Sequence, residues 1–252
     1  MKILATHQPQ YLPWLGFFDK LDRADLFVLL DNVQFKKREW QNRNRINTAT
    51  GWQWLTVPVR HCTRPPISEV EIDQTAPWAL KHLRALEVNY RRAPHFQNHL
   101  SLLEEILLDS WTHLCPLNIA LIHRLAAGLG IDTRMRLASE VPVQGKGTAR
   151  LVNLCLALGA DVYLTGAGGA AYLDLHTFAA AGIEVRWQEF CHPIYPQRYN
   201  SFEPNLSIVD LLLNCGDQSL DILRSTRSEA EQATLTRSGS LAFVESPREG
   251  GP

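Results

Sequence analysis

The chain lacks the long apolar run that a membrane span requires. No segment approaches 18 uncharged apolar residues, and the N-terminus has no apolar core followed by a small-residue cleavage site. The 252 residues include 25 Lys and Arg against 26 Asp and Glu, a formal net charge of -1. This balance gives no global attraction to nucleic acid or to an anionic membrane. We expect a cytoplasmic protein with no membrane insertion.

Paired cysteines and the signatures of several enzyme classes are also missing. The five cysteines are scattered without a CxxC pair, so we expect reduced thiols and no structural zinc site. The sequence has no Gly-x-Ser-x-Gly elbow, His-Glu-x-x-His helix or Walker motif, which removes support for the common hydrolase and P-loop interpretations. It predicts no metal site and leaves any cofactor unknown.

Short apolar runs alternate with helical patterns along the chain. Strands are predicted over residues 3–5, 26–30, 54–59, 133–137, 161–165 and 184–190, with an edge strand over 67–72. Apolar spacings of three and four predict helices over 15–21, 78–90, 96–108, 119–129, 148–158 and 176–181. This alternation favours an α/β fold with a mostly parallel open sheet and helices on both faces. We expect one domain over residues 1–216 and a partly disordered tail over 217–252.

A polar-aromatic segment follows the first predicted strand. It contains His7, Gln8, Tyr11 and Trp14, with two prolines that stiffen the loop and so reduce the cost of ordering it. Ligands of open α/β sheets bind beyond the carboxyl ends of the strands, which is where this segment lies. We therefore predict a ligand site here. The structural alternative is that His7 bonds a carbonyl group and Trp14 belongs to the core.

A second segment, residues 31–45, begins at the carboxyl end of the second predicted strand. Its candidate site residues are Asp31, Gln34, Lys36, Arg38, Trp40, Gln41, Asn42 and Arg43. Guanidinium groups match phosphates or carboxylates, and aromatic rings stack on bases or sugars, so the segment suits a phosphorylated or nucleotide-linked ligand. Single-stranded nucleic acid and a merely solvated hairpin remain alternatives.

Three later segments are further candidates. A glycine-rich approach to a helix exposes backbone N–H groups that suit an anion, with Thr148 as the natural N-cap. Glycines after a strand permit close approach of a ligand, and a histidine after the last strand can pair with His7 in acid–base chemistry. The residues concerned are Lys146, Thr148, Arg150, Gly166, Gly168, Gly169 and His192. A helix cap, a tight turn and a buried histidine explain them equally.

Longer blocks of the sequence form a family pattern. The blocks are His7-Gln8-Pro9-x-Tyr11-Leu12-Pro13-Trp14-Leu15-Gly16-x-Phe18-Asp19-Lys20, Asp31-x-Val33-Gln34-Phe35 and Trp40-Gln41-Asn42-Arg43. They resemble the WbqC-like protein family, over roughly residues 2 to 216. The resemblance implies an association with bacterial surface-polysaccharide and O-antigen gene clusters, and therefore a role in building or modifying an activated sugar. A weaker analogy, at the level of the fold, is to the HUP-like core of nucleotidyltransferases and class I synthetases.

The leading prediction is a transferase or nucleotide-activating enzyme that acts on a phosphorylated or nucleotide-linked sugar. Lys36, Arg38 and Arg43 would hold phosphate, and Tyr11, Trp14 and Trp40 would pack on sugar or base. His7, assisted by Asp31 or His192, would move the proton. Gln8, Lys20, Gln34, Gln41 and Asn42 complete the predicted binding set.

Two alternatives stay open. One is a non-catalytic binding or scaffold protein of a polysaccharide assembly complex, and the other is single-stranded nucleic-acid binding through residues 35–45. The net charge argues against nucleic acid as a partner. The sequence leaves the oligomeric state unknown.

Overall fold

The structure, a computed structural model, describes residues 1–60, 65–199 and 201–227. Within these ranges, five strands form a parallel sheet and two form an antiparallel hairpin. The sheet strands are β1 (Ile3–His7), β2 (Leu26–Leu29), β5 (Arg134–Leu137), β6 (Val162–Gly166) and β7 (Glu184–Gln188). The hairpin strands are β3 (Arg43–Thr48) and β4 (Gly51–Thr56).

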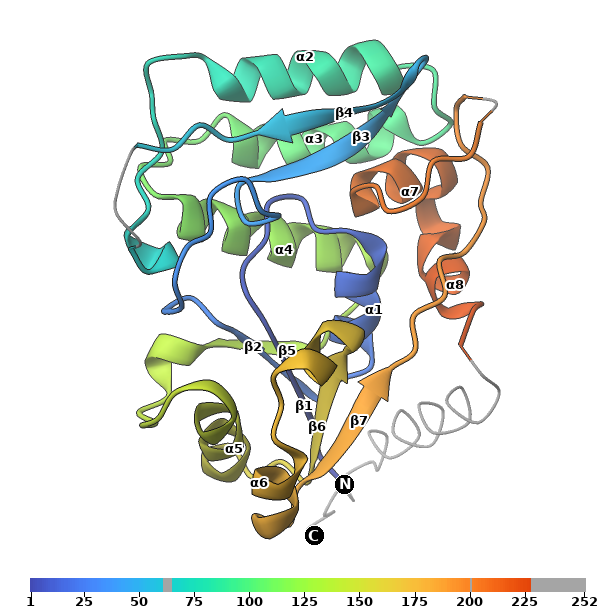
Figure 1. Cartoon of the computed structure of the whole chain (residues 1–252). Coiled ribbons are helices and arrows are strands. Elements are labelled where there is room, and N and C mark those ends of the chain that lie inside the picture. Colours follow the sequence, from blue (N-terminus) through green and yellow to red (C-terminus); the bar gives the residue numbers. More distant parts are fainter. Residues whose placement is uncertain (61–64, 200, 228–252) are drawn as a thin grey trace, which may run out of the picture.

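Eight α-helices of the described ranges pack on the sheet and on the hairpin (Figure 1). The α-helices are α1 (Leu15–Asp22), α2 (Trp78–Tyr90), α3 (Phe96–Leu107), α4 (Leu114–Leu129), α5 (Gly147–Ala157), α6 (Leu175–Ala180), α7 (Ile208–Cys215) and α8 (Ser219–Arg224). Short 3₁₀ turns cover Ile67–Glu69, Ala138–Glu140, Ala167–Ala171 and Gly216–Gln218.

The strand order places a topological switch point in the middle of the sheet. The order is β5-β2-β1-β6-β7, and every pairing between neighbours is parallel. The chain therefore winds outward from β1 to β5 and then returns to the other side of β1 with β6. The prediction of an α/β fold with a mostly parallel sheet is confirmed. The carboxyl ends of β1 and β6 meet where ligands of such sheets bind. The likeness to the HUP-like core stays a prediction.

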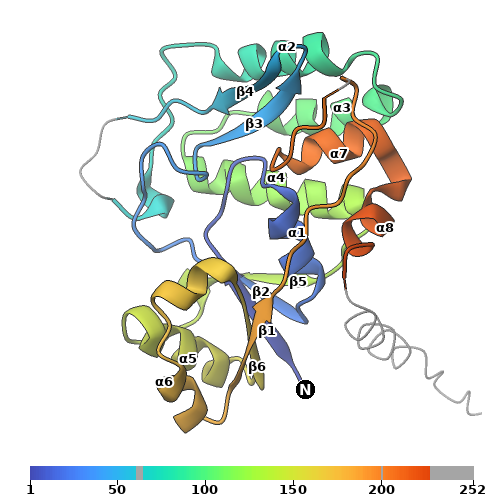
Figure 2. The same ribbon diagram turned by 45° about the vertical axis from the view of Figure 1, so that its right-hand side comes forward.

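Alternate residues of the strands enter two different cores. Leu4 and Val28 belong to a smaller core that the sheet forms with α5 and α6. Ala5 and Phe27 point to the opposite face and join a larger core with α1, α3, α4 and α7. This alternation follows from the two-residue period of a strand. Figures 1 and 2 show α5 and α6 on one side of the sheet and α1 and α4 on the other, so helices cover both faces.

The crossover from β2 to β5, residues 30–133, contains the hairpin and helices α2, α3 and α4. β4 pairs with β3 rather than with the main sheet, and the sequence interpretation missed β3 because its residues are mostly polar. The predicted edge strand over 67–72 is wrong: Ile67–Glu69 is a 3₁₀ turn. Ile67 and Val70 are both buried at the three-residue spacing of that turn, directly after a proline that favours turns.

The C-terminal part of the described chain packs on α1. Helix α8 lies within the stretch expected to be a partly disordered tail, and it contacts α1. Residues 228–252 lie outside the described residues, and the domain boundary at 216 stays a prediction. In the described ranges, no helix is both long and apolar enough to cross a membrane. Cys115, Cys155, Cys191 and Cys215 are free thiols, while Cys62 lies outside the described residues.

Candidate functional site

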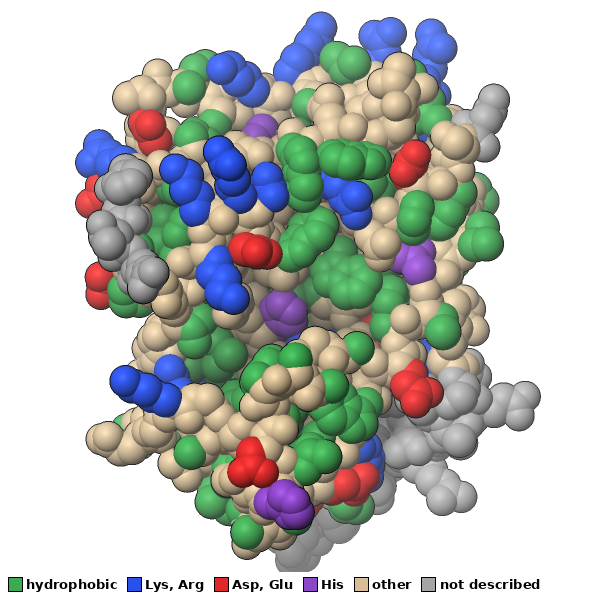
Figure 3. All heavy atoms as spheres, viewed as in Figure 1, with side chains coloured by type: hydrophobic (Ala, Val, Ile, Leu, Met, Phe, Trp, Pro, Cys, Tyr) green, Lys and Arg blue, Asp and Glu red, His purple; other side chains and the backbone are tan. Residues whose placement is uncertain are grey.

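A cleft of about 860 Å³ opens at the carboxyl ends of β1, β6 and β7. Thr6 and His7 of β1, Thr165 of β6 and Gln188 of β7 line it. Figure 3 shows a hollow in the middle of the face that is turned toward the viewer in Figure 1. The cleft therefore occupies the switch point of the sheet, where the sequence placed the first candidate segment.

Lys20 lies at the floor of the cleft. It projects from α1, it is 6% exposed, and its ammonium group donates to the backbone oxygen of Thr6 at 3.0 Å. No carboxylate forms an ion pair with it in the described ranges, and the acidic side chain lining the cleft, Glu189, is exposed. Burial lowers the pKa of Lys20 from 10.5 to about 7. A buried cation without a counter-ion suits an anionic ligand group.

His7 lies beside Lys20 at the end of β1. Burial, and next the Lys20 ammonium, lower the pKa of His7 from 6.5 to about 3, so the ring is neutral at pH 7. Its Nδ1 lies 3.0 Å from the backbone oxygen of Gln8. A carbonyl group only accepts, so Nδ1 carries the proton and Nε2 keeps a lone pair. The ring of Phe17 meets His7 edge-on at 5.0 Å. His7 is thus oriented as an acceptor.

Trp14 forms a wall of the cleft and requires the glycine two residues later. A Cβ atom at Gly16 would lie 2.4 Å from the Trp14 ring. Phe190, which also lines the cleft, meets the same ring edge-on at 5.2 Å. The Trp14 ring can therefore lie flat over the first turn of α1 only because residue 16 has no side chain.

The glycine-rich turn after β6 forms another wall. Gly166, Gly168 and Gly169 line the cleft, and a Cβ atom at Gly169 would lie 2.5 Å from Thr165 Oγ1. The turn is tied to the start of α5, because Thr148 Oγ1 accepts from the backbone N–H of Asp174 at 3.1 Å. Thr148 is not the N-cap, a position that Lys146 occupies. The prediction of Thr148 as N-cap is therefore wrong, because its hydroxyl bonds the backbone after the glycine-rich turn instead.

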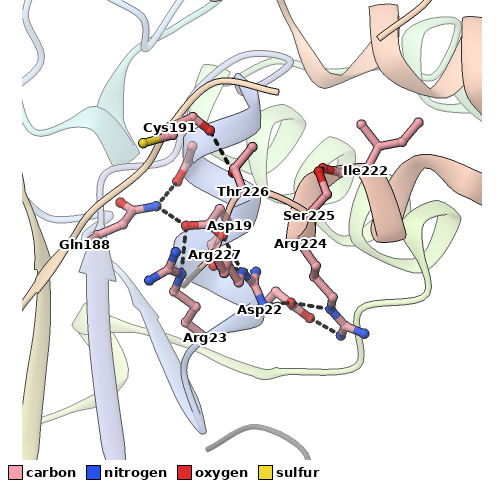
Figure 4. A network of polar contacts seen from close by, with 11 residues as sticks. Asp19, Asp22, Arg23, Gln188, Cys191, Ile222, Arg224, Ser225, Thr226 and Arg227 are labelled. Atoms are coloured by element: carbon pink, nitrogen blue, oxygen red, sulfur yellow. Dashed lines mark hydrogen bonds and ion pairs between the residues drawn. The ribbon is translucent and has the colours of Figure 1, made fainter. Parts of the chain in front are cut away.

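A buried polar network lies behind the cleft (Figure 4). Gln188, in the cleft lining, donates through Nε2 to the backbone oxygen of Gly16 at 2.8 Å and to Asp19 Oδ2 at 2.7 Å. Asp19 also pairs with Arg23 at 2.9 Å and with Arg227 at 2.7 Å. These partners occupy the Asp19 carboxylate. It therefore does not pair with Lys20, the next residue of α1, which lines the cleft.

The hairpin segment adjoins the cleft through an amide pair. Gln41 Nε2 donates to Gln8 Oε1 at 2.6 Å, and Gln41 Oε1 accepts from the backbone N–H of Lys36 at 2.7 Å. Lys36 and Arg38 are exposed, whereas Trp40 and Arg43 are partly buried. These four residues lie beside the cleft but do not line it.

Comparisons with known proteins agree with the resemblance found in the sequence motifs. The model of the WbqC-like protein family matches residues 8–222. The chain belongs to the WbqC-like protein family. It is also 40% identical, over 231 residues, to a protein named "Uncharacterized protein Rv1507c" from Mycobacterium tuberculosis (strain ATCC 25618 / H37Rv). That alignment covers 90% of this chain and 100% of the relative. No solved structure gives a significant match.

Several candidate residues of this WbqC-like chain have internal partners away from the cleft. The Tyr11 hydroxyl is fully buried and hydrogen-bonded to His82 Nδ1 at 2.8 Å. Asp31 Oδ1 accepts from the backbone N–H of Ser139 at 2.9 Å, and Asn42 donates to the backbone oxygen of Val57, just after β4, at 2.9 Å. None of these side chains lines the cleft, and their hydrogen bonds within the protein indicate a structural role.

His192 is likewise engaged on both ring nitrogens. Its Nδ1 lies 2.8 Å from the backbone oxygen of Pro193, and its Nε2 accepts from the backbone N–H of Asn205 at 3.1 Å. Gln34 is exposed and forms an isolated bridge with Pro66, and Arg150 donates to Asn32 Oδ1. The structure does not bring these three candidates into the cleft lining with His7.

The sequence interpretation of the WbqC-like chain missed part of the cleft. Thr165, Trp187, Gln188 and Phe190 line it, yet none was a candidate. Three of them lie in the last two residues of β6 or β7, and Phe190 follows β7, so the switch-point rule could have found them. Among the described residues, no cluster of three or more His, Cys, Asp or Glu side chains could hold a metal ion. The donor set of the cleft suits an anion.

Proposed function

We propose that this WbqC-like chain is an enzyme of surface-polysaccharide biosynthesis that binds a phosphorylated or nucleotide-linked sugar in the cleft. We assign it to the transferases or nucleotide-activating enzymes. The observation that carries the proposal is Lys20, a buried ammonium group without a carboxylate partner among the described residues, at the switch point of a parallel sheet. Nucleotides and their phosphate groups are among the ligands that bind at this position of open α/β sheets.

The neighbouring groups supply the remaining parts of such a site. The backbone of the turn at Gly166, Gly168 and Gly169 allows a phosphate to approach closely. Trp14 offers a flat apolar wall for a sugar ring. His7 Nε2 is the proposed acceptor for a proton leaving a hydroxyl or amine of the second substrate. Its pKa rises when a bound anion offsets the Lys20 charge, which brings it toward the working range of a base.

A thermal-shift panel tests the proposal. The purified protein is titrated with pyrophosphate, ATP, CTP and UDP- or dTDP-linked amino sugars, with and without Mg²⁺. A ligand at 100 times its Kd should stabilise the fold by about 2.7 kcal/mol. Lys20→Met should abolish the shift, while Lys81→Met, which alters an exposed lysine of α2, should leave it intact. Equal shifts in wild type and Lys20→Met would refute the cleft as the anion site.

Turnover separates an enzyme from a binding protein. With the nucleotide sugar that gives the largest shift, His7→Asn should retain binding and lose product formation. A ligand that binds through Lys20 but is not converted under any acceptor condition favours the non-catalytic alternative.

A further inference from the structure

The β3–β4 hairpin carries arginines and tryptophans on one face. The antiparallel register places Arg45 opposite Trp54 and Asn47 opposite Trp52. Residues paired directly across two strands share a face, and so do residues two positions apart along a strand. The opposite face, with Ile46 and Leu55, is buried in the larger core. Arg43, Arg45, Trp52 and Trp54 thus face outward, and with Trp40 they form what we call the Trp–Arg platform.

The two guanidinium groups lie over the indole rings. Arg43 Cζ is 4.1 Å from the centroid of Trp54, and Arg45 Cζ is 4.9 Å from that of Trp52 and 5.5 Å from that of Trp40. Stacking of this kind uses the flat face of a guanidinium group. It holds the side chain in place while leaving the N–H donors along its edge for another partner.

Those donors are largely unused. Within the described ranges, neither Arg43 nor Arg45 pairs with a carboxylate, and the one hydrogen bond of their guanidinium groups runs from Arg45 Nη2 to the backbone oxygen of Asn205 at 3.1 Å. The other Nη donors of these two groups have no acceptor among the described residues, so they remain for an acceptor from outside the chain.

The platform adjoins the cleft through backbone contacts. Ser207 forms an isolated β-bridge with Trp14, which lines the cleft, and its N–H donates to the backbone oxygen of Arg45 at 2.9 Å. On the other flank, Gln41 follows Trp40 in the chain and bonds Gln8 of the cleft lining. Figure 3 shows Lys and Arg side chains, with hydrophobic side chains between them, gathered over the hairpin next to the hollow.

We infer that the Trp–Arg platform is a second subsite, which binds the nucleoside and its adjacent phosphate in a substrate whose sugar and sugar-linked phosphate lie in the cleft. The free guanidinium edges match phosphate oxygens, and Trp52, 43% exposed, offers a ring on which a base can stack. The exposed Lys36 and Arg38, on the turn before β3, add positive charge at the same edge. The inference rests on the proposed function. It assigns a binding site to the nucleotide part of the ligand, for which the cleft alone provides none.

Isothermal titration with pyrophosphate, UDP, ADP and glucose 1-phosphate tests the subsite. Wild type should bind UDP or ADP at least about fivefold more tightly than pyrophosphate, the gain expected from stacking of one base. Trp52→Ala and Arg45→Gln should remove that gain. Trp52→Ala should leave the pyrophosphate affinity unchanged. Leu80→Ala and Arg84→Gln alter exposed side chains of α2, far from the hairpin in sequence, and serve as matched controls.

The outcomes separate this inference from the proposed function. If UDP and ADP bind no more tightly than pyrophosphate, or keep their gain in Trp52→Ala, the subsite is refuted while Lys20-dependent pyrophosphate binding can stand. If Lys20→Met leaves pyrophosphate binding unchanged, the cleft proposal fails, and dependence of UDP binding on Trp52 still supports the platform. A gain seen only with glucose 1-phosphate, or only with a ten-nucleotide oligothymidylate, overturns the nucleotide assignment.

Discussion

Arg227 Nε lies 2.7 Å from Asp19 Oδ1, and both side chains are almost fully removed from solvent. This ion pair joins the C-terminal end of the described chain to α1, the helix that presents Lys20 to the cleft. Arg227 also lies 2.8 Å from Asp22, which accepts two hydrogen bonds from Arg224 (Figure 4). The C-terminal segment therefore holds α1, the helix that carries Lys20, in place.

Replacing Arg227 with Met should destabilise the fold strongly. The change leaves the carboxylate of Asp19, 0% exposed, with one fewer cation in a buried setting. Breaking such a pair typically costs about 3 kcal/mol or more. Arg84→Gln breaks an exposed pair with Glu87 and should cost no more than about 1 kcal/mol. Urea denaturation of both variants measures the difference, and equal midpoints would contradict the bracing role.

Gly16→Ala should damage the cleft although alanine favours helices. The added Cβ would lie 2.4 Å from the Trp14 ring and would force it away from its place in the wall. We expect a loss of about 1–3 kcal/mol in the free energy of unfolding, the usual cost of overpacking, and weaker nucleotide binding. Gly168→Ala is the matched control for stability, because no atom lies within 4 Å of its added Cβ. Thermal melts of the two variants without ligand compare their stability, and melts of wild type and the Gly16 variant with ligand measure the loss of binding.

The sequence predicted the framework better than the site. Apolar periodicity placed the five sheet strands and located the first candidate segment at a strand end, because burial on two sheet faces leaves a clear local pattern. It missed β3, where the outward Arg43 and Arg45 and the buried Asn44 and Asn47 all read as polar. Asn44 and Asn47 can be buried because segments distant in sequence, the end of α2 among them, supply their hydrogen-bond partners. No local pattern encodes those partners.

The candidate site residues show the same contrast between local pattern and contacts from distant segments. His7, Gln8, Trp14 and the glycines after β6 line the cleft because strand ends converge at a switch point, which is a rule of topology. Tyr11 belongs to the same sequence block but is buried against His82. A family-like block thus mixes residues of the cleft with residues of the framework. Only the three-dimensional contacts separate them.

Lys20→Met should stabilise the protein while removing anion binding. The pKa of Lys20 is lowered from 10.5 to about 7, so the stability linked to it is present above pH 10.5 and is lost as the pH falls toward 7. Methionine has a similar length and does not titrate, so the variant does not lose this stability at pH 7. A tenfold change in an acid dissociation constant corresponds to about 1.4 kcal/mol, so we expect a gain of at least that size at pH 7, measured by urea denaturation.

The same group should control the pH dependence of binding. Sulfate keeps one charge state from pH 6 to 9, whereas the Lys20 ammonium is lost above pH 7, so sulfate affinity should fall across this range in wild type. Titrations at four pH values measure it. A flat profile in wild type, or the same slope in Lys20→Met, would assign the anion to another group.

His7→Asn should make the protein more resistant to acid. The pKa of His7 is lowered from 6.5 to about 3, mainly by burial. The stability contributed by this histidine is present above pH 6.5 and is lost as the pH falls toward 3, because protonation is easier in the unfolded chain. Asparagine does not titrate and keeps a side-chain donor near the backbone oxygen of Gln8. Between pH 6.5 and 5, the stability of wild type should fall relative to the variant by about 1–2 kcal/mol.

Urea midpoints at pH 7.5, 6.5 and 5 give the comparison for this histidine. His176→Asn, at an exposed position of α6, controls for the loss of any histidine. Parallel pH profiles for wild type and His7→Asn would mean that the pKa of His7 is the same in the folded and the unfolded chain. The ring would then be charged below pH 6.5. Nε2 would have no lone pair there for the proposed proton transfer, because both ring nitrogens of a charged imidazole carry protons.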